Sequence, residues 1–182
     1  MAADQFACTA AVLDETPDAV VVSNLGVASY VLAEVDDRDR NFYLWGSMGS
    51  TTATGIGVAR GTEEQVTVLA GDGSLTMSLG VLSTVVTADQ PNLTVVCFDN
   101  NIYGTTGGQA TPSIDFAAAA EAQGLPAASA TTDEAFADAY EAAVERDGPS
   151  LIQCVVEPTD PEGRPTFDFP QIPRRVRDSL RE

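Results

Sequence analysis

The sequence contains neither lysine nor histidine. Without histidine, the chain has no imidazole for metal ligation, for Ser-His-Asp or Cys-His nucleophilic systems, or for acid–base catalysis. Its nine basic residues are all arginine and stand against 27 Asp and Glu residues, which gives a formal net charge of −18. So acidic a surface repels nucleic acid and anionic membranes, and we expect neither as a partner. The acid excess and the missing lysine together predict a halophilic protein, adapted to molar salt; an ordinary solvated acidic surface is the simpler interpretation.

Cysteine is scarce, and long apolar runs are absent. Cys8, Cys97 and Cys154 are far apart and form no C-x-x-C pair, so neither a zinc site nor an iron–sulfur cluster is indicated. Cys97 and Cys154 stand in apolar runs and are expected to be reduced core residues. The amino-terminal segment has no basic region before an apolar stretch, and no apolar run reaches the roughly 18 residues of a membrane span. We therefore expect a soluble, cytoplasmic protein.

Short apolar runs alternate with helix-like segments along the chain. The apolar runs are nearly continuous and are bounded by Gly, Asp, Asn or Pro, which is typical of parallel strands buried on both faces. This alternation predicts an α/β fold with a three-layer, doubly wound and mostly parallel sheet. The expected strands are 19–23, 41–45, 65–70, 93–98 and 150–156, and the expected helices are 28–35, 50–60, 74–88, 114–124 and 132–148.

Helix signals are clearest near the carboxyl end of the chain. Thr132 is the expected N-cap of the last of these helices, and Gly148-Pro149 is its expected stop. Residues 1–157 are predicted to form one domain. Residues 158–182 are predicted to form a Pro-rich extended tail that ends in a short helix over 174–182.

Three polar or glycine-rich loops follow predicted strands. They are Gly46–Gly49, Gly71–Ser74 and Asp99–Gly104. In doubly wound sheets ligands bind at the carboxyl ends of the strands, where such loops lead into helices. The three loops therefore predict one site at one edge of the sheet.

The loop Gly71–Ser74 places a carboxylate between two glycines at a helix start. Glycines permit close approach of a ligand to the backbone, and helix N-termini attract phosphate. A bare phosphate would be repelled by Asp72, so this carboxylate makes most sense as a ligand of a divalent cation that bridges to the phosphate. A plain turn is the alternative. The loop after the next strand adds amide oxygens from Asn100 and Asn101, which would suit Mg²⁺, or it is an Asn-rich turn.

The two loops together resemble the diphosphate–magnesium motif of thiamine-diphosphate enzymes, "GDG" followed after a helix and a strand by "NN". The resemblance implies a PP-type, thiamine-diphosphate-binding domain over residues 1–157. It implies Asp72, Asn100 and the carbonyl of Ile102 as Mg²⁺ ligands; Asn100 is preferred to Asn101 because the family's Asn stands three residues before the Tyr. The remaining residues expected to bind the cofactor in these two loops are Gly71, Gly73, Ser74, Tyr103, Gly104 and Thr105, the last from the start of the next helix.

The loop around "GSMG" (46–49) resembles the segment that grips the aminopyrimidine ring in thiamine-dependent decarboxylases. The resemblance implies that the Gly46 carbonyl, Ser47 and the Met48 N–H bind this ring, with the Met48 side chain holding the cofactor bent. The alternative for Met48 is plain core packing. Asn24 and Gly26, after the first strand, are further candidates to line the pocket.

The nearest resemblance is to the small, separate beta subunit of sulfopyruvate and phosphonopyruvate decarboxylases, whose chains carry motifs similar to "GSMG", "GDGS" and "DN…YG…TGGQ". It implies a decarboxylase of three-carbon 2-oxo acids with thiamine diphosphate and Mg²⁺ as cofactors. The family's activating Glu has no place in this chain, so no catalytic residue is assigned here. A separate pyrimidine-binding (alpha) subunit is expected to supply that Glu in a hetero-oligomer, together with much of the substrate recognition. The tail arginines Arg164, Arg174, Arg175 and Arg177 are expected to pair with carboxylates or to contact this partner.

Three alternatives share the same loops. One is an acetolactate-synthase-like carboligase subunit, and another is a non-catalytic cofactor-binding partner. A ferredoxin-coupled 2-oxo acid oxidoreductase subunit is disfavoured by the lack of clustered cysteines.

Overall fold

A six-stranded parallel sheet forms the centre of the protein. The structure is a computed structural model and describes residues 2–181. Its strand order is β2-β1-β3-β4-β8-β7. The strands are β1 (Val20–Ser23), β2 (Asn41–Tyr43), β3 (Val66–Gly71), β4 (Leu93–Asp99), β7 (Ala127–Ala130) and β8 (Ser150–Val155). The chain leaves β1 for β2 on one side and then returns to β3 on the other. The strand order therefore reverses beside β1, which is where doubly wound sheets bind ligands.

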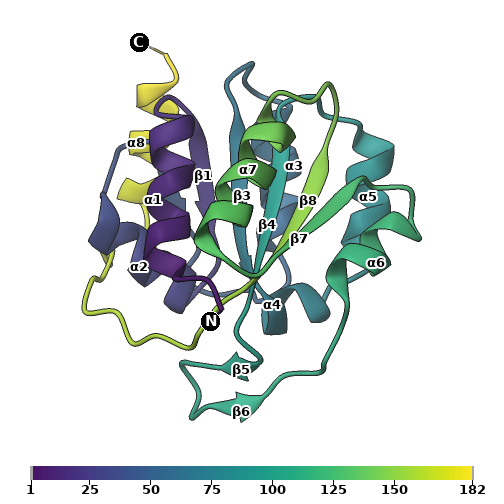
Figure 1. Cartoon of the computed structure of the whole chain (residues 1–182). Helices are drawn as coiled ribbons and strands as arrows, with labels where there is room; N and C mark the ends of the chain where they lie inside the picture. The colour runs from purple at the N-terminus through teal and green to yellow at the C-terminus, as the bar shows by residue number, and fades with distance from the viewer. Residues whose placement is uncertain (1, 182) are drawn as a thin grey trace.

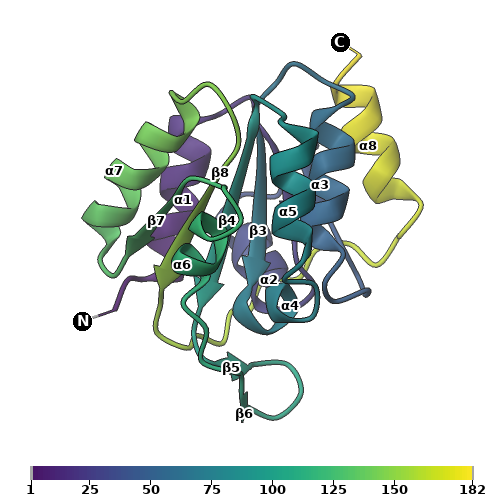
Figure 2. The ribbon, with the colours of Figure 1, turned by 90° about the vertical axis from the view of Figure 1, so that its right-hand side faces the viewer.

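Helices cover both faces of this sheet, so the molecule has three layers (Figures 1 and 2). Figure 2 shows α1 and α7 on one side and α3 and α5 on the other. The helices are α1 (Gln5–Glu15), α2 (Val27–Val35), α3 (Thr51–Ala59), α4 (Asp72–Thr76), α5 (Val81–Ala88), α6 (Phe116–Glu121), α7 (Asp133–Val144) and α8 (Gln171–Ser179). The expected three-layer α/β class is confirmed.

Successive side chains of each strand point to opposite faces of the sheet, so the hydrophobic core has one part on each face. Val21 packs in the cluster under α1, α2 and α7, whereas Val20 and Val22 pack in the cluster under α3, α4, α5 and α6. All three valines are fully buried. Strands that are apolar toward both faces appear in the sequence as continuous apolar runs, which is why they were recognisable.

Several elements differ from the sequence-based expectation. The helix expected over 74–88 is two helices, α4 and α5, because small residues such as Ser78 and Gly80 between them have weak helix propensity. Helix α1, strand β7 and a separate hairpin of β5 (Ile102–Tyr103) and β6 (Gln109–Ala110) were not expected. The N-cap prediction is confirmed, since Thr132 Oγ1 accepts a hydrogen bond from the Ala135 N–H at 3.2 Å.

The carboxyl-terminal segment packs back on the domain. Helix α8 begins three residues earlier than expected and packs against the edge strand β2, with Ile172 in one core cluster and Val176 in the other. Before it, the extended segment lies along the 44–50 loop, where the Trp45 indole N–H donates to the Thr166 carbonyl at 2.9 Å and the Trp45 ring stacks on Phe167.

Two of the tail arginines have partners within this chain. Arg175 forms an ion pair with Asp37 at 2.6 Å, and Arg177 forms one with its neighbour Asp178 at 2.6 Å. The expectation that tail arginines pair with carboxylates is confirmed for these two. The Arg164 guanidinium lies instead over the Tyr30 ring, 4.0 Å from its centroid.

The three cysteines are free and buried, as expected for Cys97 and Cys154. Burial raises the pKa of the Cys97 thiol well above its ordinary value. Cys8 and Cys154, far apart in the sequence, meet in the core with their sulfur atoms 3.8 Å apart. None of the helices within residues 2–181 is long and apolar enough to cross a bilayer.

Candidate functional site

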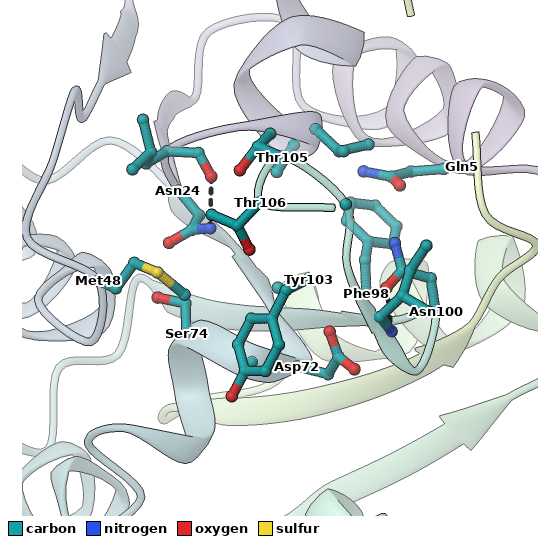
Figure 3. Close-up of a pocket in the computed structure, with 17 residues that line it drawn as sticks. Gln5, Asn24, Met48, Asp72, Ser74, Phe98, Asn100, Tyr103, Thr105 and Thr106 are labelled. Atoms are coloured by element: carbon teal, nitrogen blue, oxygen red, sulfur yellow. Dashed lines mark hydrogen bonds between the residues drawn. The ribbon is translucent and has the colours of Figure 1, made fainter. Parts of the chain in front are cut away.

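A cavity opens at the carboxyl ends of β1, β3 and β4, where the strand order predicts it (Figure 3). It brings together residues from all three loops that the sequence singled out. The predicted site residues in its lining are Met48, Gly71, Asp72, Gly73, Ser74, Asn100, Ile102, Tyr103, Gly104 and Thr105. The predicted cofactor contacts Gly46 and Ser47 lie in the same 44–50 loop but outside this lining.

The turn at the end of β3 is tightly packed. Gly71 ends the strand, and Asp72 begins α4 with only 3% of its surface exposed. A Cβ atom built on Gly73 would lie 2.3 Å from Cε1 of Tyr103, so only glycine leaves room for this ring. Ser74 Oγ accepts a hydrogen bond from the Gly49 N–H at 2.9 Å and so joins this turn to the 44–50 loop.

The Asp72 carboxylate is buried and has no basic side chain as a partner among the described residues. Burial raises the pKa of Asp72 above its ordinary value, and the negative charge of nearby Asp99 raises it further. The Thr111 hydroxyl, which donates to Asp72 Oδ2 at 2.5 Å, opposes the rise, as do the backbone N–H groups of Gly73 and Asn101. Among the described residues no ion pair involves Asp72. A buried carboxylate that lacks a positive partner is suited to a bound cation.

The segment after β4 separates its two asparagines. Asn100 lines the cavity beside Asp72, and its Oδ1 accepts a hydrogen bond from the Ile102 N–H at 3.1 Å. Asn101, in the left-handed region with φ of 59°, lines a neighbouring cavity with Asp99 and Gln153. The structure thus favours Asn100 over Asn101 as a companion of Asp72.

The expected helix start at Thr105 is wrong. Thr105 lies in the exposed turn between β5 and β6, because the chain after Tyr103 reverses into a hairpin before α6. Its side chain still lines the cavity, and its methyl group packs against Gly26.

Other residues of the site were missed in the sequence. Gln5 of α1, 2% exposed, and Phe98 of β4 line the cavity. Thr111, the residue that follows β6, contacts Asp72. No local motif marks Gln5 or Thr111, because only the tertiary fold brings them to the turn at Asp72. Asn24, which was a candidate, lines the cavity, and its Oδ1 accepts from the Thr51 hydroxyl at 3.1 Å.

The cavity is small. Its volume is about 70 Å³, well below the roughly 300–1,000 Å³ of pockets that enclose a drug-sized ligand. It has room for a metal ion and its immediate ligands, so this chain alone encloses one end of any larger cofactor.

Comparison with known proteins identifies the family. The model of the thiamine pyrophosphate enzyme C-terminal TPP-binding domain matches residues 23–154, which include all three loops. The chain belongs to this family.

Related proteins align with most of this chain. Phosphonopyruvate decarboxylase of Streptomyces viridochromogenes is 42% identical over 171 residues, which cover 91% of this chain and 43% of that protein. Sulfopyruvate decarboxylase subunit beta of Methanothermobacter thermautotrophicus is 40% identical over 143 residues, 78% of this chain and 75% of that one. The chain therefore spans less than half of the first relative and most of the second.

A solved structure of similar fold is the thiamine diphosphate-dependent 4-hydroxybenzoylformate decarboxylase of Rhodococcus jostii RHA1. Its TM-score is 0.77 at 24% identity, over 86% of this chain and 33% of that one. At this identity the likeness concerns the fold alone.

The residues of this TPP-binding domain fit the cofactor for which the family is named. Hard oxygen donors, the Asp72 carboxylate and the Asn100 amide, share one cavity, as Mg²⁺ requires. Gly71, next to Asp72, lines the same cavity and, having no side chain, permits close approach of a phosphate group to the backbone.

Proposed function

We propose that this chain is the diphosphate- and magnesium-binding subunit of a thiamine-diphosphate-dependent decarboxylase acting on sulfopyruvate or phosphonopyruvate. The observation that carries the proposal is the buried Asp72 carboxylate, which lines a cavity together with Asn100 between glycine-rich loops. The names of the relatives, phosphonopyruvate decarboxylase and sulfopyruvate decarboxylase subunit beta, support the reaction and the substrate class.

Asp72, the Asn100 side-chain oxygen and the Ile102 carbonyl are the proposed Mg²⁺ ligands. Magnesium takes octahedral oxygen ligands and is commonly bound by one or two carboxylates together with phosphate oxygens and water. The lining of the cavity by both side chains supports this assignment. The position of Asn101 in a different cavity argues against its use as the ligand.

The diphosphate is proposed to lie between the turn Gly71–Ser74 and the segment Tyr103–Thr105. The first supplies backbone N–H groups at a close approach, and the second covers the cavity from the hairpin side. The proposed ring contacts are Gly46, Ser47 and Met48. Met48 already reaches into the cavity lining, and the hydrogen bond from Gly49 to Ser74 keeps this loop beside the turn.

Bound thiamine diphosphate supplies the electron sink for decarboxylation. The contribution of this chain is to bind and orient it, since orientation of reacting groups is a large part of catalysis. Asp72 is the only carboxylate among the described residues that line the cavity, and as a ligand of the proposed metal it would not serve as the activating carboxylate. The activating Glu is therefore proposed to come from a pyrimidine-binding alpha subunit.

The substrate's second anionic group also requires this partner. No Arg lines the cavity among the described residues, and the chain has no Lys or His. A sulfonate or phosphonate needs charged or N–H donors. We expect the partner to supply them, and the small volume of the cavity agrees with a site shared between two chains.

The test is the release of carbon dioxide from sulfopyruvate, phosphonopyruvate and pyruvate with Mg²⁺ and thiamine diphosphate at high salt. This chain is assayed alone and with its pyrimidine-binding partner, and acetolactate is measured in parallel. Release only with the partner supports the proposal, and the preferred acid identifies the substrate. Acetolactate without net decarboxylation of the other acids supports a carboligase. Cofactor binding without turnover supports a non-catalytic subunit.

A further inference from the structure

The β5–β6 hairpin projects from the body of the protein below the carboxyl edge of the sheet (Figures 1 and 2). Its two strands pair over only two residues each, with Ile102 opposite Ala110 and Tyr103 opposite Gln109. Residues 104–110 are exposed, whereas the next residue, Thr111, is buried with 9% exposure. So short a hairpin depends on contacts at its base for a defined position.

Two side chains at the base of the hairpin, Tyr103 and Thr111, contact the turn that carries Asp72. The Tyr103 ring lies over Gly73, and the Thr111 methyl carbon lies 3.1 Å from the position of a Cβ atom on Gly73. The Thr111 hydroxyl donates to Asp72 Oδ2 at 2.5 Å. No side chain other than Thr111 donates a hydrogen bond to this carboxylate within the described residues.

Thr111 also closes the hairpin. Its backbone N–H donates to the Asn101 carbonyl at 3.1 Å, next to the proposed ligand Asn100. Thr111 thus binds the proposed ligand Asp72 through its hydroxyl and, through its amide, binds Asn101, the chain neighbour of the proposed ligand Asn100. A hydroxyl that donates to one carboxylate oxygen fixes the rotation of the carboxylate and leaves the other oxygen for a metal.

We propose that Thr111 is a positioning residue that couples the β5–β6 hairpin to the metal ligand Asp72. With a metal bound, the oriented carboxylate would hold Thr111, and Thr111 would hold the hairpin at the cavity that its residues line. When the metal is absent, the hairpin is attached less firmly. The inference rests on the metal site proposed above, and it adds a residue whose side chain touches neither cofactor nor substrate.

The test compares two variants at this position. Thr111→Val keeps the shape and removes the hydroxyl, and Thr111→Ser restores the hydroxyl. Thr131→Val is the control, because Thr131 is exposed and lies far along the chain from the hairpin. Each is prepared as the full chain with the pyrimidine-binding subunit. Binding of Mn²⁺ in the presence of thiamine diphosphate is measured by electron paramagnetic resonance, and exchange of the amides of residues 104–110 is measured with and without metal and cofactor.

Loss of a partner that orients a metal ligand typically weakens metal binding about 10–100-fold. We expect Thr111→Val to weaken Mn²⁺ binding at least about tenfold and to abolish the slowing of amide exchange in the hairpin. Thr111→Ser should bind within about threefold of the wild type, and Thr131→Val should be unchanged. Rescue of Mn²⁺ binding by serine would assign the effect to the hydroxyl rather than to packing of the threonine methyl group.

The outcomes separate the two proposals. If the wild type binds Mn²⁺ and Thr111→Val binds it equally well, the positioning role is wrong while the metal site stands. If the wild type binds Mn²⁺ and amide exchange in its hairpin does not change, the coupling is wrong, even where the valine variant fails to fold. If the wild type binds no Mn²⁺ with thiamine diphosphate, both the proposed function and this inference are wrong.

Discussion

Replacement of Gly73 by alanine tests the packing that shapes the candidate site. The added Cβ would lie 2.3 Å and 2.8 Å from two carbons of the Tyr103 ring and 3.1 Å from the Thr111 methyl carbon. Carbon atoms in contact are normally about 3.5–4.0 Å apart, so the ring must retreat by about 1 Å or more. Tyr103 and Thr111 both belong to the hairpin, and the displacement therefore lifts the hairpin from the turn.

The expected cost follows from two opposing terms. Forced overpacking typically costs about 1–3 kcal/mol. Removal of a glycine from a helical position returns at most about 1 kcal/mol. Subtraction of the full glycine contribution leaves a net loss of up to about 2 kcal/mol, which corresponds to a fall of up to about 8 °C in Tm for a chain of this size. Binding of Mn²⁺ with thiamine diphosphate should weaken as well, because the displaced segment carries Asn100 and Ile102.

Thermal unfolding by circular dichroism and a Mn²⁺ titration measure the two effects. Gly57→Ala is the matched control: Gly57 lies exposed within α3, and a Cβ there meets nothing within 4 Å. It should raise stability by about 0.5–1 kcal/mol and leave Mn²⁺ binding unchanged. Wild-type Tm and wild-type metal affinity in Gly73→Ala would refute the close packing of the hairpin on this turn.

Two further predictions concern charge. Asp72→Asn should abolish Mn²⁺ binding yet stabilise the metal-free protein at neutral pH, because burial raises the pKa of Asp72 and the folded state then disfavours its ionised form. The stability advantage of Asp72→Asn should be present above the folded-state pKa of Asp72 and vanish below its unfolded-state pKa, where Asp72 is protonated in both states. Urea unfolding of the variant and the wild type across pH measures this advantage. Equal stability of the two proteins at every pH would contradict the prediction. Dialysis to roughly 0.01 M salt, where the Debye length is about 30 Å, should unfold or dissociate the protein, since its formal charge is −18 and the described residues form three ion pairs. Trp45 emission together with far-ultraviolet circular dichroism separates global unfolding from detachment of the tail that stacks on Trp45, and unchanged spectra and size would remove the case for salt adaptation.

The strands that could be predicted are those whose residues are apolar toward both faces. β1, β3, β4 and β8 appear as runs of Val, Leu, Ile and Cys, since helices cover the sheet on both sides. β7 could not be recognised, because its sequence Ala-Ala-Ser-Ala has little intrinsic preference for a strand. Its conformation comes from pairing with β8.

The residues of the candidate site could likewise be predicted only where they follow a recognisable strand. Asp72 and Asn100 were predictable because each follows a recognisable strand, and parallel strands bring their carboxyl ends to one edge. Thr111 was not, because its role depends on a two-residue hairpin pairing that no periodic pattern announces. Thr105 was misplaced for the same reason, since the hairpin takes the place of the helix start that the motif suggested.

The two lateral ends of the sheet differ in a way that bears on assembly. Helix α8 packs against β2, whereas β7 has no further strand beside it among residues 2–181. An uncovered edge can add a strand from another molecule, and a sheet with two uncovered edges can do so without limit. With α8 against β2, any pairing through β7 would join two molecules and leave no second free edge for a growing fibre. Helix α8 would thereby limit strand pairing between molecules to a single pair.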